Sequence, residues 1–479
     1  MAEKNRNIIE PLVMKFGGTS VGSAEAILQT ADIITTQYAQ HTQLVVVASA
    51  MSGITNLLLS SAQAAASGNW KVYTRDISEI ESRHMETIAA LPLSDDKRQP
   101  LTAEIDAFIK QLRNYCASIE TMGELTPRGM DAIVSLGERM NVRQISAVLD
   151  AKGLANKAVD ADGLIITDDA FQNARPIREK TCERVHAVLP ALLKAGVIPV
   201  VTGFIGATEK GITTTLGRGG SDYSAAILGE CLQAQAVWTW TDVDGVMTAD
   251  PRIVPNARVI EQLSFDEVSE MAYFGAKVLH PKTMRPLIES GIPLWVKNTF
   301  NPSHPGTCIT HTPSNRIGKI TCVTAIRDVS LITVRGKGML GVPGVAARTF
   351  SAVADKQASV LMISQSSSEQ SICFVIPSHD EAAVIASLQR ELAYELERGD
   401  IDTVSALADV VIVTGIGAGM RNTPGVSAKI FSAVGAKDIN IIAIAQGSSE
   451  FSLSLVVHKK DADAAVQQIH TEVIINGQK

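Results

Sequence analysis

The chain has 479 residues, of which 46% are hydrophobic, and a formal net charge of -7 at neutral pH. This length can bury several cores and predicts about three domains of roughly 150 residues each. The charges form no basic stripe with interleaved aromatic residues, which argues against nucleic acid as a partner. No apolar run is long enough to span a bilayer and the first residues lack a signal-peptide core, so the sequence predicts a cytoplasmic protein without a membrane partner.

Short β-branched runs alternate with longer helical patterns from Leu12 to about Phe300, which is typical of an α/β domain with a parallel sheet and helices on both faces. The predicted strands are Leu12–Phe16, Leu44–Ala48, Ile198–Thr202, Val237–Thr241 and Pro293–Lys297. Residues 62–138 have helical spacing throughout and predict a helical insert beside the sheet. Two prolines and a glycine in Asn301–Gly306 predict the end of this domain, which we place at residues 1–305.

The six cysteines lie far apart and have no C-x-x-C spacing. This argues against a zinc site or a disulfide framework and predicts buried or partly buried thiols in a reducing compartment. The cysteines are Cys116, Cys182, Cys231, Cys308, Cys322 and Cys373.

Two aliphatic runs end at glycine-rich turns that open onto predicted helices: Lys15-Phe-Gly-Gly-Thr-Ser20 and Gly217-Arg-Gly-Gly-Ser-Asp222. Backbone amides at a helix N-terminus bind anions, and glycine lets the ligand approach closely. Because two such turns form the two halves of a phosphate site, the chain is predicted to transfer a phosphoryl group.

Residues beyond the proline-rich segment repeat with a fixed offset of 81 residues. Gly338-Met339 and Pro343-Gly-Val345 recur as Gly419-Met420 and Pro424-Gly-Val426, and Phe350–Val353 recurs as Phe431–Val434. Each copy predicts a strand, a helix, two strands and a helix in this order, and such short repeats are expected to pack together. We assign them to residues 321–400 and 401–479.

Five segments resemble the signatures of the aspartokinases, which belong to the amino-acid kinase superfamily. The segments are Lys15–Ser20, Gly217–Asp222, Thr241-Asp-Val-Asp-Gly245, Asp250-Pro-Arg252 and Phe274-Gly-Ala-Lys-Val-Leu-His-Pro281. They follow the family's order along nearly the whole chain, and the repeats resemble ACT ligand-sensing domains, which are βαββαβ units. The resemblance implies that 306–320 completes the second of them. The resemblance implies phosphorylation of the 4-carboxylate of L-aspartate by ATP. This reaction begins the route to lysine, threonine and methionine.

The resemblance also implies a form without the homoserine dehydrogenase domain of fused relatives. Two other interpretations stay open at this point: a kinase of glutamate or N-acetylglutamate, and a catalytically inactive regulator that binds amino acids. ATP with Mg²⁺ is expected as co-substrate without a tightly bound prosthetic group, and the sequence identifies no metal ligand. A homo-oligomer that forms through the ACT domains is expected.

Lys15 is expected to neutralise charge that develops during phosphoryl transfer, with Asp222 orienting it; a surface lysine and a helix-capping aspartate are the structural alternatives. Arg218 suits a substrate carboxylate, since arginine binds carboxylates in a bidentate way. The other residues expected at L-aspartate are Ser49, Thr55, Glu138, Phe204 and Ser221. Glu138 suits the substrate ammonium, although an isolated glutamate is usually a solvated helix residue, and Thr55 could simply cap a helix.

The residues that the resemblance assigns to the nucleotide are Gly17, Gly18, Thr19, Ser20, Gly219, Gly220, Thr241, Asp242, Arg252 and Lys277. Met247 stands where many relatives have a tyrosine near the adenine.

For the effector, the resemblance points to Gln365 and Gln446, beside backbone groups of 338–342 and 419–423. A glutamine amide can donate to and accept from a hydroxyl, so threonine is the expected effector and lysine the second choice. The alternative is that both glutamines only satisfy backbone groups in turns.

Overall fold

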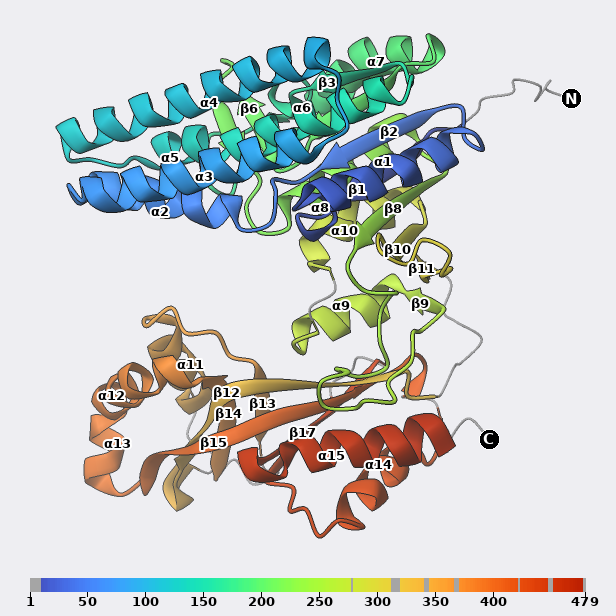
Figure 1. Cartoon of the computed structure of the whole chain (residues 1–479). Helices are drawn as coiled ribbons and strands as arrows, with labels where there is room; N and C mark the ends of the chain where they lie inside the picture. The colour runs from blue at the N-terminus through green and yellow to red at the C-terminus, as the bar shows by residue number, and fades with distance from the viewer. Residues whose placement is uncertain are drawn as a thin grey trace, which may run out of the picture. The chain divides into compact units, whose positions relative to one another are not determined.

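The computed structural model describes residues 10–276, 279–311, 319–339, 344–365, 370–420, 423–446 and 451–476. The chain forms two compact units (Figure 1). The first contains Met1–Val246, Glu261–Phe265 and Leu279–His311, and the second contains Met247–Ile260, Asp266–Val278 and Thr312–Lys479. No helix among the described residues combines the length and the apolar character that a bilayer crossing requires.

The first unit is built on an eight-stranded sheet with the order β3-β5-β2-β1-β8-β10-β11-β9. Its strands pair in parallel except β10 with β11. Their bounds are β1 Leu12–Phe16, β2 Leu44–Ala48, β3 Asn156–Val159, β5 Ile198–Thr202, β8 Ala236–Thr241, β9 Gln262–Ser264, β10 Leu294–Asn298 and β11 Thr307–Thr310. A small sheet with the order β4-β6-β7 consists of Ile166–Thr167, Ile205–Thr208 and Thr213–Thr215. All five predicted strands are confirmed to within one residue at each end.

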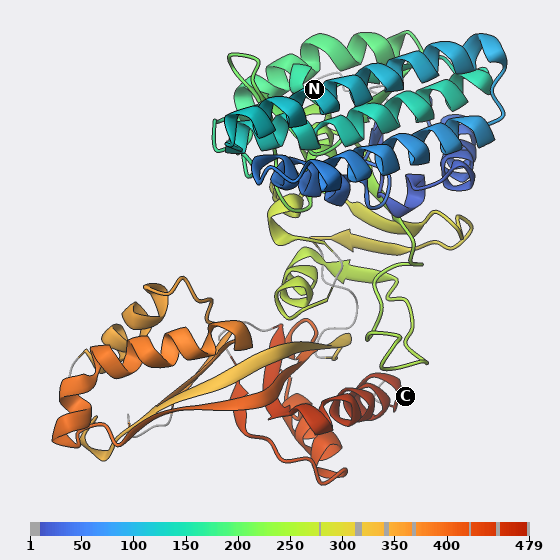
Figure 2. The same ribbon diagram turned by 60° about the vertical axis from the view of Figure 1, so that its left-hand side comes forward.

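Helices cover both faces of this sheet, and β1, β2 and β5 are therefore buried at every residue. Helices α1 and α6 pack on one face together with the predicted helical insert, whose long helices lie side by side (Figure 2). Helices α7 and α8 pack on the other face, and α10 packs against α8. The bounds are α1 Ala24–Tyr38, α2 Ile54–Ala66, α3 Trp70–Ala90, α4 Asp95–Met122, α5 Pro127–Val134, α6 Leu136–Ala151, α7 Arg178–Lys194, α8 Gly220–Leu232 and α10 Pro281–Ser290.

Side-chain alternation along β1 decides where its only charged residue points. Leu12, Met14 and Phe16 lie in the core that includes the insert. Because successive strand residues face opposite sides of a sheet, Val13 and Lys15 point to the other face, where α8 packs against β1.

The second unit contains a six-stranded antiparallel sheet with the order β13-β14-β12-β15-β17-β16. Its strands are β12 Cys322–Arg335, β13 Met362–Gln365, β14 Ser371–Pro377, β15 Thr403–Ile416, β16 Ala443–Ala445 and β17 Ser452–His458. Its helices are α9 Phe265–Tyr273, whose first residue belongs to the first unit, α11 Val345–Ala354, α12 Glu381–Glu391, α13 Ala393–Arg398, α14 Val426–Gly435 and α15 Ala462–Ile469.

The two sequence repeats share their longest strands. Strands β12 and β15 run side by side (Figure 2), and the pairing shifts register between Ile326 and Val329. Ile332 and Val334 on one side of this irregularity belong to the core of the first repeat, whereas Val323 on the other side belongs to the core of the second. Each of these strands therefore gives one half to each repeat.

The strand that completes the second repeat is the first half of β12, in which Cys322 pairs with Ile416 and Ile326 with Ile412. The segment 306–320, to which the sequence assigned this role, contributes β11 to the sheet of the first unit instead, where Thr307 pairs with Val296. At its other end, Ile320 packs in the core of the second repeat. Residues 312–318 lie outside the described residues.

The expectation that all six cysteines are thiols is wrong for two of them. Cys182 on α7 and Cys231 on α8 form a disulfide with a Cα–Cα distance of 4.9 Å. They are 49 residues apart in the sequence, and only the packing of α7 against α8 brings them together. Cys116, Cys308 and Cys322, together with Cys373, are free.

The register irregularity generates a stability prediction. Asp328 and Asp409 occupy equivalent places in the two long strands and have left-handed φ angles of 56° and 53°. Asp328→Val and Asp409→Val should each lower the free energy of unfolding of the second unit by about 1 to 2 kcal/mol, because a β-branched residue disfavours this conformation.

Denaturant unfolding of the full chain, followed by circular dichroism, measures the change. Glycine at either position should keep or raise the stability, and Asp355→Val, at a residue with φ of -59°, is the matched control. Equal stability of the valine and glycine variants would contradict the backbone argument.

Candidate active site

Strands β5, β2, β1 and β8 are adjacent and parallel, so the loops that follow them meet at one edge of the sheet. Backbone hydrogen bonds join these loops to neighbouring strands: Ser49 N–H donates to Phe16 O at 3.1 Å, Gly203 N–H to Ala48 O at 2.9 Å and Gly17 N–H to Trp240 O at 3.0 Å. The chain leaves β1 toward β2 on one side and returns through β8 on the other. In open α/β sheets, ligands bind in the crevice that such a reversal leaves at the carboxyl ends of the strands.

An ion pair joins the two glycine-rich turns at this edge. Lys15 Nζ lies 2.7 Å from Asp222 Oδ1. Lys15 is the next-to-last residue of β1 and is 7% exposed, and Asp222 lies in the first turn of α8. The structure thus brings together the two residues that the sequence predicted as catalytic.

The first turn keeps only part of its polar surface open. Gly18 packs closely on the loop after β2, because a Cβ on it would lie 3.1 Å from Ala50 O. Ser20 is buried, and its hydroxyl donates to Trp240 O at 3.2 Å and accepts from Thr299 Oγ1 at 2.7 Å. Gly17 is half-buried and Thr19 is exposed, so the turn offers backbone groups and Thr19 to a ligand, while the Ser20 hydroxyl holds neighbouring strands.

The second turn requires glycine for both conformation and space. Gly217 and Gly219 have φ angles of 76° and 73°, in the left-handed region. A Cβ on Gly220 would lie 2.5 Å from Phe204 Cδ2, and a Cβ on Gly203 would lie 2.6 Å from the Ser221 side chain. The segment Gly203-Phe204 therefore packs closely on Gly220-Ser221 at the start of α8, which places Phe204 and Ser221 in one region of the site.

Arg218 lies at the exposed tip of this turn. Within the part of the chain that the structure describes, its guanidinium has no hydrogen-bond or ion-pair partner. A cation so placed is available for an anionic ligand.

Asp131 fixes the strand that carries the second turn, and sequence reasoning missed it. Its buried carboxylate accepts from the N–H of Thr215 at 3.0 Å, from the Thr215 hydroxyl at 2.8 Å and from the N–H of Gln172 at 3.0 Å. Burial raises its pKa, and these hydrogen bonds oppose that shift. The only sequence signal was a carboxylate in the otherwise apolar run Met130–Val134.

Glu138 lies beneath the loop Ser49–Gly53, which we call the acceptor loop. It is 3% exposed, its carboxylate accepts from the Ala50 N–H, and its Oε2 has no hydrogen-bond partner among the described residues. Burial raises its pKa to about 8. A buried carboxylate oxygen without a donor is suited to a cation such as a substrate ammonium.

The helix α2 begins directly after the acceptor loop. Its N-cap is Gly53, with a φ of 83°, and Thr55 is already the second helical residue. The capping alternative for Thr55 is therefore wrong, and its half-buried hydroxyl stands beside the acceptor loop.

The predicted nucleotide residues are only partly assembled in the first unit. Thr241 ends β8, and its hydroxyl donates to Asp242 Oδ1 at 3.1 Å. Arg252 belongs to the second unit, where its exposed guanidinium pairs with Asp250 at 2.5 Å, and Met247 lies in the same segment. Lys277 lies outside the described residues.

No three His, Cys, Asp or Glu side chains come together as metal ligands in the described ranges. Magnesium usually takes most of its ligands from nucleotide phosphates and water. The residues present are compatible with Mg²⁺ that enters as part of its ATP complex.

The predicted effector residues end equivalent strands of the two repeats. Gln365 is the last residue of β13, and Gln446 directly follows β16. Both are exposed, and Gln446 Oε1 accepts from Ser427 Oγ at 3.5 Å. The position equivalent to Ser427 in the first repeat is Ala346, so the Gln365 amide has no such donor. Of the backbone groups expected at the effector, 340–342 and 421–422 lie outside the described residues.

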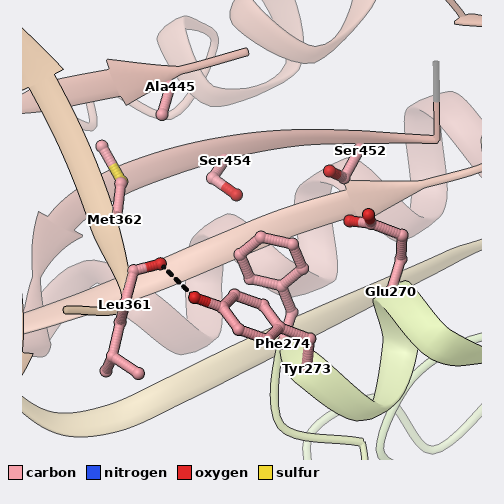
Figure 3. Close-up of a pocket in the computed structure, with 8 residues that line it drawn as sticks. All are labelled: Glu270, Tyr273, Phe274, Leu361, Met362, Ala445, Ser452 and Ser454. Atoms are coloured by element: carbon pink, nitrogen blue, oxygen red, sulfur yellow. Dashed lines mark hydrogen bonds between the residues drawn. The ribbon is translucent and has the colours of Figure 1, made fainter. Parts of the chain in front are cut away.

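A cavity of about 290 Å³ lies on the sheet of the second unit, beneath α9 (Figure 3). Ser452 and Ser454 face it, whereas Leu453 between them packs in the helix-covered core. The Tyr273 hydroxyl donates to Leu361 O at 3.2 Å and so ties α9 to the start of β13. The lining residues are Glu270, Tyr273, Phe274, Leu361, Met362, Ala445, Ser452 and Ser454.

Comparison with known proteins agrees with this geometry. The amino acid kinase family matches residues 10–298, and the ACT domain matches residues 332–392 and 413–473. The chain belongs to the amino acid kinase family. The kinase fold, the two ACT modules and the resemblance to aspartokinases, all predicted from the sequence, are thereby confirmed.

The chain is 37% identical to the chloroplastic bifunctional aspartokinase/homoserine dehydrogenase 1 of Zea mays, over 97% of this chain and 50% of that protein. It is 34% identical to the chloroplastic aspartokinase 1 of Arabidopsis thaliana, over 97% of this chain and 80% of that protein. The chain thus spans about half the length of the bifunctional relatives.

Among solved structures, the chain is similar to E. coli aspartokinase III in complex with aspartate and ADP (R-state), with 31% identity and a TM-score of 0.79 over 97% of this chain and 100% of that one. The same enzyme in complex with lysine and aspartate (T-state) gives 32% identity and a TM-score of 0.77, over 96% and 99% of the two chains.

The burial of Glu138 leads to a prediction about pH. Its pKa of about 8 in the folded chain exceeds the ordinary value of 4.5, so with rising pH the unfolded chain loses this proton before the folded chain does. The ligand-free wild type should therefore lose stability from about pH 5 to about pH 8. Glu138→Gln removes this loss, so its thermal midpoint should rise relative to the wild type over the same range.

Differential scanning fluorimetry along this pH series measures both midpoints. Glu79→Gln is the control, because that carboxylate is exposed on α3 and its substitution should give a difference that stays constant with pH. A constant difference for Glu138→Gln as well would show that Glu138 is already ionised in the folded protein.

Proposed function

We propose that this chain transfers the γ-phosphoryl group of ATP to the 4-carboxylate of L-aspartate and releases 4-phospho-L-aspartate and ADP. The observation that carries the proposal is the Lys15–Asp222 ion pair, which joins two glycine-rich turns at one sheet edge. Phosphoryl transfer depends mainly on positioning and on positive charge at the transferred group, and both are available there. In E. coli aspartokinase III, a similar chain accommodates aspartate and ADP.

The charges around the acceptor loop favour a free α-amino acid as acceptor. Arg218, which has no partner among the residues that the structure describes, offers its guanidinium for an α-carboxylate. Glu138 offers for an α-ammonium a buried oxygen that is likewise unpartnered in that part of the chain. N-acetylglutamate has no ammonium and would leave Glu138 without its ligand. L-glutamate retains both groups but is one methylene longer, so the enzyme assay must distinguish it from L-aspartate as the acceptor.

The reaction requires no general base to activate the nucleophile, because the attacking carboxylate of the substrate is already ionised at neutral pH. ATP enters with Mg²⁺, which neutralises phosphate charge. Lys15 neutralises the charge that grows on the transferred group and on the departing phosphate, and Asp222 holds the ammonium over the first turn. The backbone N–H groups of Gly18 and Gly219 would hold the phosphates, whereas those of Gly17 and Gly220 already donate to Trp240 O and Gly217 O and shape the two turns.

Feedback regulation through the ACT modules is the second part of the proposal. Threonine is the proposed effector and lysine is the alternative. Lysine is bound, together with aspartate, in the T-state structure of E. coli aspartokinase III. The reaction would open the route to lysine, threonine and methionine. Assembly into a homo-oligomer, a cytoplasmic location, the nucleotide roles of Thr241, Asp242, Arg252 and Lys277, and the domain limits 1–305, 321–400 and 401–479 stay predictions.

ADP release coupled to NADH oxidation tests the activity, with L-aspartate, L-glutamate and N-acetyl-L-glutamate as acceptors. We expect turnover with L-aspartate alone. Lys15→Met should reduce it about a hundredfold or more, because the charge acts mainly in the transition state.

Lys152→Met is the matched control, since Lys152 forms an exposed ion pair with Asp32 on the surface. It should keep near wild-type turnover. Turnover with L-glutamate or N-acetyl-L-glutamate but not with L-aspartate would show that the chain is a glutamate-type kinase. Absence of turnover with all three acceptors would favour the inactive regulator.

Inhibition by amino acids tests the effector. Threonine should inhibit the wild type, and Gln365→Ala should weaken this inhibition without changing uninhibited turnover, because differential affinity for an effector typically contributes about 1 to 3 kcal/mol of coupling. Gln446→Ala should have the smaller effect, since Ser427 already engages the Gln446 amide.

Gln370→Ala, at an exposed glutamine near β14, is the control. Inhibition by lysine alone, with both glutamine variants behaving like the wild type, would overturn the threonine assignment but not the kinase activity.

A further inference from the structure

A chain of three buried side chains lies behind the acceptor loop. His84 on α3 and Gln144 on α6 are both 0% exposed, and His84 Nδ1 lies 2.6 Å from Gln144 Nε2. The same Gln144 nitrogen donates to Met51 Sδ at 3.8 Å. Met51 belongs to the acceptor loop and is 2% exposed. His84 thus contacts Gln144, and Gln144 alone contacts the loop residue Met51.

The orientation of the Gln144 amide assigns the tautomer of His84. With Gln144 Nε2 placed toward Met51 Sδ and His84 Nδ1, the amide nitrogen can only donate, so the ring nitrogen Nδ1 accepts and the ring proton lies on Nε2. Gln144 Oε1 and His84 Nε2 then have no hydrogen-bond partner among the described residues. Burial and the neighbouring Arg83 lower the pKa of His84 to about 4. The histidine is therefore neutral near pH 7 and acts as a fixed acceptor for the amide.

The rest of the acceptor loop is held from the same helices. Asn141 Nδ2 donates to Ser49 O at 2.6 Å, and the Ala50 N–H donates to Glu138. Arg83 Nη2 donates to Ser52 O at 2.7 Å. Met51 lies between these anchored residues, and its sulfur contacts Gln144.

The position of Ala50 depends on its neighbours in the loop. A Cβ on Gly137 of α6 would lie 2.9 Å from Ala50 Cβ, so α6 and the loop are in close contact. Met51 directly follows Ala50 in this closely packed loop. A displacement of Met51 would therefore move the Ala50 N–H away from Glu138 and shift the Glu138 carboxylate.

We propose that His84 and Gln144 are positioning residues for the acceptor amino acid, which they influence through Met51 and the acceptor loop; this rests on the proposed function. Neither residue touches the substrate. Their loss should therefore affect acceptor binding and leave the nucleotide turns as they are.

Steady-state kinetics of the full chain tests the proposal with His84→Leu, His84→Asn and Gln144→Met. His84→Leu and Gln144→Met each remove a buried hydrogen bond and should raise the KM for L-aspartate about five- to fiftyfold, with the KM for ATP unchanged and a smaller fall in kcat. His84→Asn places an acceptor near the former Nδ1 and should restore most of the affinity.

His41→Leu is the matched control. His41 Nδ1 lies 2.9 Å from Gln235 Nε2, in a histidine–glutamine contact that is exposed and remote from the acceptor loop. This variant should leave both KM values at wild-type level. Equal rises in both KM values for His84→Leu, or no rescue by asparagine, would overturn the proposal.

A readout independent of activity separates this proposal from the proposed function. In protein labelled with ¹³C-methyl methionine, Met51→Leu identifies the Met51 resonance. His84→Leu should shift that resonance, His84→Asn should return it toward its wild-type position, and His41→Leu should leave it unchanged. An unmoved Met51 resonance in His84→Leu would refute the positioning role, whereas a wild type that uses no aspartate would refute only the function.

Discussion

The contact between Lys15 and Asp222 is the constraint on which the first unit's site depends. It links a residue at the end of the central strand to one in the first turn of a helix that follows much later in the chain. The pair forms only if β1 keeps its register, because a slip of one residue would turn Lys15 toward the helical insert. It also requires α8 to start at Gly220, which packs too tightly on Phe204 for any side chain.

The helical insert and α6 hold the loops of the site through buried polar side chains. Asp131 fixes the strand that leads to Arg218, and Glu138 and Asn141 hold the loop on the other side of the site. Several of these groups are polar and fully buried, which costs free energy unless every atom finds a partner. Glu138 Oε2 and His84 Nε2 have none in the described ranges. The unpartnered Glu138 oxygen lowers stability where the ligand is expected to bind, whereas His84 lies behind the acceptor loop.

Much of the fold could be predicted from the sequence, because strand alternation and glycine turns are local signals. The strands from Leu12 to Asn298, the helical insert and the repeat of 81 residues were all visible. Contacts between distant segments were not. The Cys182–Cys231 disulfide and the role of Asp131 depend on helix packing. The segment 306–320 was assigned to the second repeat from the family resemblance alone, whereas the completing strand begins at Cys322. Motif matching found Lys15 and Asp222, but the residues that hold the acceptor loop lie outside every motif.

The sharing of β12 and β15 makes the ACT pair indivisible. A cut anywhere between the repeats removes half of a central strand from each, since residues on both sides of Asp328 and Asp409 pair across the whole unit. Neither repeat is a separate folding domain, although the sequence reads as two. Recombination between relatives could therefore exchange effector specificity only by transplanting both repeats together with the segment from Cys322 onward.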